Sequence, residues 1–77
     1  MSWRDYIVAD PGVLVGKPVV KGTRIAVELV LQLKARGLSD AEILEDYPRL
    51  SSQAIRACMA YAAEIVAGER MHPLSAA

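Results

Sequence analysis

The strongest constraint on the fold is a short junction, Gly37 to Ser39, at which one helix has to end and the next begin. Gly37 can take the left-handed conformation that closes a helix, and Lys34 and Arg36 just before it suit the negative end of that helix. Ser39 followed by Glu42 is a capping box, which starts a second helix at once. The chain therefore turns sharply between two helices that pack close together.

Hydrophobic spacing predicts three helices around this junction, at residues 26–36, 40–47 and 52–68. Pro48 ends the second helix and Ser51 caps the third. Apolar residues recur at helical spacing along the third helix, so we expect them to form a continuous core stripe. The members of that stripe are Ile55, Cys58, Met59, Ala62, Ile65 and Val66.

Two short segments rich in β-branched residues precede the helices. The first, residues 6–8, is stopped by the turn residues Asp10 to Gly12, and the second covers residues 18–20. A ribbon of this length needs helices beneath it to persist, so we expect the two strands to pair antiparallel on the helices. Trp3 is expected to pack as a lid on the core. The predicted fold class is mainly α, with three helices and a short N-terminal β ribbon.

The composition indicates one small globular domain. Of the 77 residues, 53% are hydrophobic, and we assign residues 1–68 to the domain and 69–77, with the single histidine His72, to a flexible tail. A core of this size is marginal, so a partner chain would stabilise it. The single cysteine, Cys58, is expected to be a buried and unreactive residue. No apolar run approaches the ~20 residues of a membrane span, which favours a cytoplasmic protein without membrane contact.

Enzymatic activity is not expected. Acid and base catalysis needs paired titratable groups in a cleft, whereas the carboxylates here cluster on the short second helix and the histidine lies in the tail. A phosphate-binding loop needs a lysine directly after its second glycine, but Thr23 follows Gly22. We therefore predict no catalytic residues, no metal ligands and no cofactor.

Positive charge gathers in the N-terminal half of a chain that is neutral as a whole. Residues 1–38 carry a net charge of +3 and residues 39–67 carry −3. Lys17, Lys21 and Arg24 lie in a stretch that Pro18 stiffens and that Gly16 and Gly22 allow to turn, which predicts a partner-binding loop. The alternative is a structural turn with exposed lysines, in which Arg24 pairs with Glu28 four residues later on the helix edge.

The first helix is apolar over an arc of roughly 240°, wider than one core contact needs. This breadth predicts a homodimer or partner surface that includes Val27, Leu31 and Lys34. Replacing Leu31 with glutamate would then give monomers. The alternative is that the N-terminal ribbon covers the second side of the helix.

Two capped helices joined by a tight turn are also typical of a helix-turn-helix, whose second helix reads bases with residues near its N-terminus. Two arginines against four nearby carboxylates are a weak electrostatic attraction for DNA, so a dimer or a charged partner would be needed. The candidate DNA-binding residues are Arg49, Ser51, Ser52, Gln53 and Arg56.

A larger pattern of turn, cap and apolar residues spans positions 5–67. It comprises Asp10, Pro11, Gly16, Lys17, Pro18, Gly22, Thr23, Arg24, Ile25, Gly37, Leu38, Ser39, Ile43, Leu44, Tyr47, Pro48, Leu50, Ser51, Ile55, Ala57, Tyr61 and Ala62. With its spaced GxP and GTR sequences, the pattern resembles the domain of unknown function 433 family. Ala54 stands where that family tends to have an acidic residue, which weakens the cap of the third helix.

This resemblance implies a homeodomain-like helix-turn-helix fold and a specific role. Such domains are often encoded beside a PIN-like ribonuclease toxin and are taken to be its antitoxin. The implied partners are that toxin and operator DNA, through which an antitoxin represses its own operon. The alternatives are a stand-alone helix-turn-helix regulator and a protein-interaction module that does not bind DNA.

Overall fold

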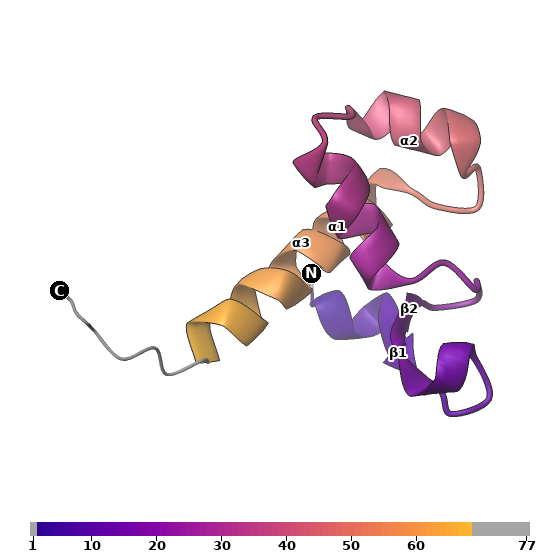
Figure 1. Ribbon diagram of the computed structural model, residues 1–77, viewed down its shortest axis with the longest axis vertical. Coiled ribbons are helices and arrows are strands. Elements are labelled where there is room, and N and C mark those ends of the chain that lie inside the picture. Colours follow the sequence, from indigo (N-terminus) through magenta and orange to yellow (C-terminus); the bar gives the residue numbers. More distant parts are fainter. Residues whose placement is uncertain (1, 69–77) are drawn as a thin grey trace, which may run out of the picture.

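A two-stranded ribbon precedes three α-helices, which confirms the mainly α fold predicted above (Figure 1). The computed structural model describes residues 2–68; the predicted tail and His72 lie outside them. A short 3₁₀ turn precedes each strand, at Trp3–Asp5 and at Leu14–Gly16. The strands are β1 (Ile7–Ala9) and β2 (Pro18–Val20), and the helices are α1 (Val27–Ala35), α2 (Asp40–Asp46) and α3 (Ser52–Gly68).

The ribbon is antiparallel, with Val8 opposite Val19 and Ile7 opposite Val20. Val19 also forms an antiparallel bridge to Ala26, the residue before α1. The chain therefore turns back alongside β2 before it enters the helix. Both Val19 and Val20 are buried, at 1% and 4% exposure, because the ribbon is covered on both faces at this point. The ribbon thereby fixes where the loop between β2 and α1 leaves the body of the protein.

The predicted junction between α1 and α2 is confirmed in detail. Gly37 has φ = 91°, and the backbone N–H of Leu38 donates to the carbonyl of Leu33 at 3.2 Å, which closes α1. Both halves of the capping box are present: the Glu42 N–H donates to Ser39 Oγ at 3.2 Å, and the Ser39 N–H donates to Glu42 Oε1 at 2.8 Å. These contacts satisfy backbone groups that the helix ends would otherwise leave unpaired.

The core lies where β1, β2 and the three helices meet, and only part of the predicted α3 stripe belongs to it. Ile55 and Cys58 are fully buried, as expected, but Met59, Ile65 and Val66 are 44%, 53% and 62% exposed. The C-terminal end of α3 extends past the other helices, which leaves Ile65 and Val66 more than half exposed (Figure 1). The buried set is Ile7, Val19, Val20, Val27, Val30, Leu33, Ile43, Leu50, Ala54, Ile55, Ala57 and Cys58.

The first residues are fastened to α3 by a cluster around Trp3, which packs on the core as expected. Its ring meets Tyr61 edge-on with 4.8 Å between ring centroids, and its Nε1 donates to Glu64 Oε2 at 2.9 Å. Arg4 pairs with the other Glu64 oxygen at 3.0 Å. These hydrogen bonds, first that of Trp3 and then that of Arg4, lower the pKa of Glu64.

No helix in residues 2–68 combines the length and the apolar character that a membrane crossing requires.

Candidate functional site

The loop between β2 and α1, residues 21–25, is held by a dense set of short hydrogen bonds. Gly22 has φ = 80°, a conformation that costs other residues energy. The Thr23 hydroxyl donates to the Val20 carbonyl at 2.8 Å and accepts from the Ile25 N–H at 2.9 Å. The Thr23 N–H donates to the same Val20 carbonyl at 3.0 Å. Thr23 therefore organises the loop, and the residues on either side of it are held in place.

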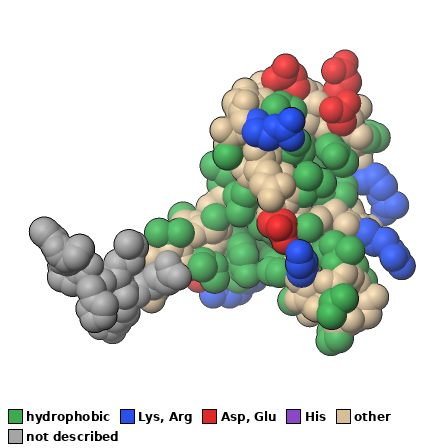
Figure 2. Space-filling model, viewed as in Figure 1, with side chains coloured by type: hydrophobic (Ala, Val, Ile, Leu, Met, Phe, Trp, Pro, Cys, Tyr) green, Lys and Arg blue, Asp and Glu red, His purple; other side chains and the backbone are tan. Residues whose placement is uncertain are grey.

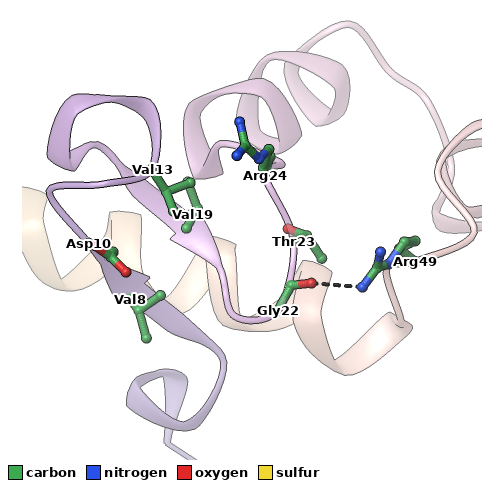
Figure 3. Close-up of a pocket in the computed structure, with 8 residues that line it drawn as sticks. All are labelled: Val8, Asp10, Val13, Val19, Gly22, Thr23, Arg24 and Arg49. Atoms are coloured by element: carbon green, nitrogen blue, oxygen red, sulfur yellow. Dashed lines mark hydrogen bonds between the residues drawn. The ribbon is translucent and has the colours of Figure 1, made fainter.

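A side chain 27 positions later in the sequence than Gly22 holds this loop in place. Arg49, in the turn between α2 and α3, donates from its guanidinium to the Gly22 carbonyl at 2.8 Å (Figure 3). The contact joins the predicted partner-binding loop to the turn that begins the predicted DNA-binding region. Arg49 was predicted as a DNA-binding residue, and this hydrogen bond gives it a structural role.

The ion pairs differ from those expected in the loop. Glu28 pairs with Lys17 at 2.9 Å. The Arg24–Glu28 pair of the alternative interpretation is therefore not formed, and that prediction is wrong. Lys21 and Arg24 are exposed, and neither forms an ion pair with any residue in the range 2–68. Lys17, which precedes β2, takes the place on Glu28 that was expected for Arg24. Lys21 and Arg24, rather than Lys17, are therefore the cations that this loop presents.

A pocket of about 420 Å³ lies beside the loop, between β1, the turn before β2 and Arg49. Valines from three segments form its apolar part, and Asp10, Arg24 and Arg49 supply its charges (Figure 3). Asp10 Oδ1 accepts from the Gly12 N–H at 2.8 Å, which stabilises the turn after β1. The lining residues are Val8, Asp10, Val13, Val19, Gly22, Thr23, Arg24 and Arg49.

The predicted surface on α1 is only partly on the surface. Val27 is 2% exposed and packs in the core, so its assignment to a dimer or partner surface is wrong. Leu31 is half-buried against the same core, and Lys34 forms an ion pair with Asp40 at 2.8 Å. The ribbon and the other helices thus cover most of the wide apolar arc, as the alternative interpretation expected.

The N-terminal part of α3 presents the remaining candidate residues. The Ser51 hydroxyl accepts from the Ala54 N–H at 3.0 Å, so it caps the helix. Ser52, Gln53 and Arg56 are exposed. Figure 2 shows carboxylates gathered over α2 and basic side chains on the edge where the loop after β2 lies in Figure 1. On this face, positive charge therefore gathers near the loop of residues 21–25, and negative charge gathers over α2.

No three His, Cys, Asp or Glu side chains of residues 2–68 are placed to share a metal ion. Burial raises the pKa of the Cys58 thiol to about 11, which keeps it protonated at neutral pH.

Sequence reasoning missed the turn before β2. Leu14 and Val15 have φ values of 50° and 55°, and Val15 is 96% exposed. A β-branched residue in left-handed backbone is a genuine outlier, and no sequence signal predicts it. The other missed residue, Asp10, was assigned to the turn but not to the pocket that it lines.

Comparison with known proteins agrees with this architecture. Residues 7–62 match the model of a family described as protein of unknown function, DUF433. An uncharacterized protein, y4eO of Sinorhizobium fredii (strain NBRC 101917 / NGR234), is 39% identical over 59 residues, which are 77% of this chain and 27% of that protein.

A solved structure gives the same result. The crystal structure of a DUF433 member protein from Anabaena variabilis ATCC 29413 at 2.00 Å resolution matches with a TM-score of 0.73 and 30% identity. The match covers 79% of this chain and 60% of that chain, so the present chain spans less than two thirds of either relative. Sequence and structure together place this chain in the DUF433 family.

Proposed function

We propose that this chain is an antitoxin-like protein that binds and neutralises a PIN-like ribonuclease through the loop of residues 21–25. The observation that carries the proposal is the presentation of Lys21 and Arg24. Both are exposed, no carboxylate in residues 2–68 pairs with either, and the backbone between them is fixed by the Thr23 hydrogen bonds. Preorganisation of this kind lowers the entropy lost when a partner binds.

The chemistry of the partner fits these cations. PIN-like nucleases hold their metal ions with clustered carboxylates, and an arginine inserted there forms charge-assisted, bidentate hydrogen bonds with a carboxylate. Arg24 supplies that planar group. Lys21, which directly follows β2, adds a second positive charge. Pairing of this kind would displace metal ions from the nuclease and stop hydrolysis.

The test measures the inhibition of the proposed cognate PIN-like nuclease by the purified chain. We expect Arg24→Ala to weaken inhibition by about 10-fold to 100-fold, the range for a hydrogen bond to a charged group. Lys21→Ala should have a smaller effect in the same direction. Arg36→Ala is the matched control, because Arg36 is an exposed arginine at the opposite end of α1. Full inhibition by the folded Lys21 and Arg24 variants would exclude the loop from the mechanism.

DNA binding by the same protein is the second proposal, supported by the exposure of Gln53 and Arg56 one turn apart on α3. An antitoxin of this type would repress its own operon, with these two residues reading bases near the helix N-terminus. Gel-shift assays with DNA from upstream of the gene should show binding that weakens steeply with salt. Binding unchanged by joint replacement of both residues with alanine would locate the DNA site elsewhere, and absence of binding would leave a protein-interaction module.

A further inference from the structure

We propose that the pocket beside the loop receives an aliphatic side chain of the partner protein, adjacent in the partner's sequence to an acidic residue. This inference rests on the proposed function, because it names what the same face of the molecule recognises. The pocket would make the recognition by Lys21 and Arg24 more specific. Its valine-lined part takes the aliphatic side chain, and Arg24 and Arg49 at its edge pair with the neighbouring carboxylate.

The size of the pocket limits its occupant. Ligand pockets commonly measure about 300 to 1,000 Å³, and the 420 Å³ here is near the lower end. That space suits one side chain and the backbone beside it, not a packed helix. Val8 and Val13 are half-buried in the chain alone, so their methyl groups still contact solvent and would be covered by an aliphatic group.

The charges around the pocket favour an acidic residue beside the aliphatic residue of the partner. Arg24 and Arg49 outnumber the one carboxylate, Asp10, which already accepts from the Gly12 N–H. In Figure 3, Asp10 and Arg49 lie on opposite sides of the pocket with Arg24 between them, and Asp10 forms no ion pair with either arginine. Arg49 uses one of its five N–H donors on Gly22, which leaves others for a carboxylate.

A nucleic acid fits this pocket less well than a protein. A phosphate would find the arginines but would leave the valines exposed to solvent. An acidic residue beside an aliphatic one uses both halves of the pocket.

The turn before β2 extends this surface. Val13 lines the pocket, and two residues later Val15 is 96% exposed in left-handed backbone. Residues with strained backbone conformations cluster at binding sites, where the strained backbone positions a side chain for the partner. Val15 therefore adds an apolar contact next to the pocket, for the same partner.

The first test is an NMR titration of the full chain with a capped tetrapeptide, acetyl-Gly-Asp-Leu-Gly-amide. We expect shifts concentrated at the amides of Val13, Gly22 and Thr23. Replacing the peptide's aspartate with asparagine should weaken binding about fivefold, the upper end for an ion pair open to solvent. Replacing its leucine with alanine should weaken binding about tenfold, because apolar contact is lost. No shifts up to millimolar peptide, or equal binding of all three peptides, would overturn the proposal.

The second test fills the pocket with Val13→Trp, and Arg36→Ala again serves as control. The folded variant should lose both peptide binding and nuclease inhibition. If it inhibits the nuclease like the wild type, the pocket proposal is overturned while the loop mechanism stands. Should Val13→Trp fail to fold, Val13→Leu adds less bulk and should weaken peptide binding in the same direction. A wild-type chain that binds the peptide but does not inhibit the nuclease would support the pocket and overturn the proposed function.

Discussion

Gly22 and Val15 both lie in left-handed backbone, but only the glycine suits it. Nothing lies within 4 Å of the position that a Cβ would take at Gly22, so a side chain there meets no obstacle. At Val15 the side chain is already present and 96% exposed, so it contributes almost no packing. Substitutions at these two positions therefore isolate backbone strain from side-chain contacts.

At Gly22 we expect replacement by alanine to destabilise the protein by about 1 kcal/mol, the cost of left-handed backbone for a residue with a Cβ. The melting temperature should fall by about 4–8 °C for a domain of this size. Gly68→Ala is the control, because Gly68 ends α3 and also has no neighbour near its Cβ position. An unchanged melting temperature for the Gly22 variant would mean that the loop can take another conformation at no cost.

At Val15 the opposite result is expected. Val15→Gly should stabilise the protein by about 1 kcal/mol, because it removes the strain of a β-branched residue at φ = 55° and loses no buried contact. Thermal melting measured beside the Gly22 variant checks the sign. A lower melting temperature for Val15→Gly would show that Val15 makes contacts that stabilise the turn.

The elements were most predictable where their signals are local. The capping box at Ser39, the left-handed Gly37 and the Ser51 cap each depend on residues within four positions of one another, and all three are present. Burial along α3 was predicted less well, because helical spacing identifies an apolar face but not whether another element covers it. Val66 has the right spacing and is 62% exposed, since α3 is longer than the body against which it packs.

The α2 cap makes stability depend on pH. Hydrogen bonds from Ser39, first from its backbone and then from its side chain, lower the pKa of Glu42 below its usual 4.5. A carboxyl group whose pKa is lower in the folded state stabilises the fold above its unfolded pKa, and this contribution is lost as the pH falls through the folded value. Acidification should therefore loosen the start of α2.

Thermal melting between about pH 6 and pH 3 tests this dependence. Glu42→Gln keeps an oxygen that can accept from the Ser39 N–H but removes the titration, so its melting temperature should fall less over this range. Glu45→Gln is the control on the same helix, because the Glu45 side chain forms no hydrogen bond within residues 2–68. Parallel curves for the wild type and Glu42→Gln would contradict the assignment.

On the scale of the molecule, the site was less predictable than the elements because its contacts join distant parts of the chain. The Lys17–Glu28 pair spans 11 positions and the Arg49–Gly22 hydrogen bond spans 27. The sequence indicated that cations gather in the loop, but it did not indicate which of them the path of the chain would pair. Likewise it identified Asp10 as a turn residue, while only the fold brings it to the same pocket as Arg49.

The homodimer predicted from α1 remains a prediction, but among the helices of residues 2–68 the large apolar side chains that are most exposed lie on α3. Leu31 packs on the core, so Leu31→Glu would unfold the chain as well as separate subunits. Val66→Glu is the better test, because Val66 is 62% exposed and lies beside exposed Ile65. We expect light scattering to show a wild-type dimer and a folded Val66→Glu monomer. A wild-type monomer at millimolar concentration would remove the prediction.

The cluster around Trp3 has a practical consequence. Trp3 is the only tryptophan in the sequence, so the indole fluorescence of the protein comes from one place, the contact between the first residues and α3. Arg4 lies 4.4 Å from the centroid of the indole ring, and Tyr61 meets the ring at 78°. Solvent, charge and aromatic neighbours all change when this contact opens, and the emission spectrum changes with them. The protein thus carries its own optical reporter for the fastening of its N-terminus, with no added label.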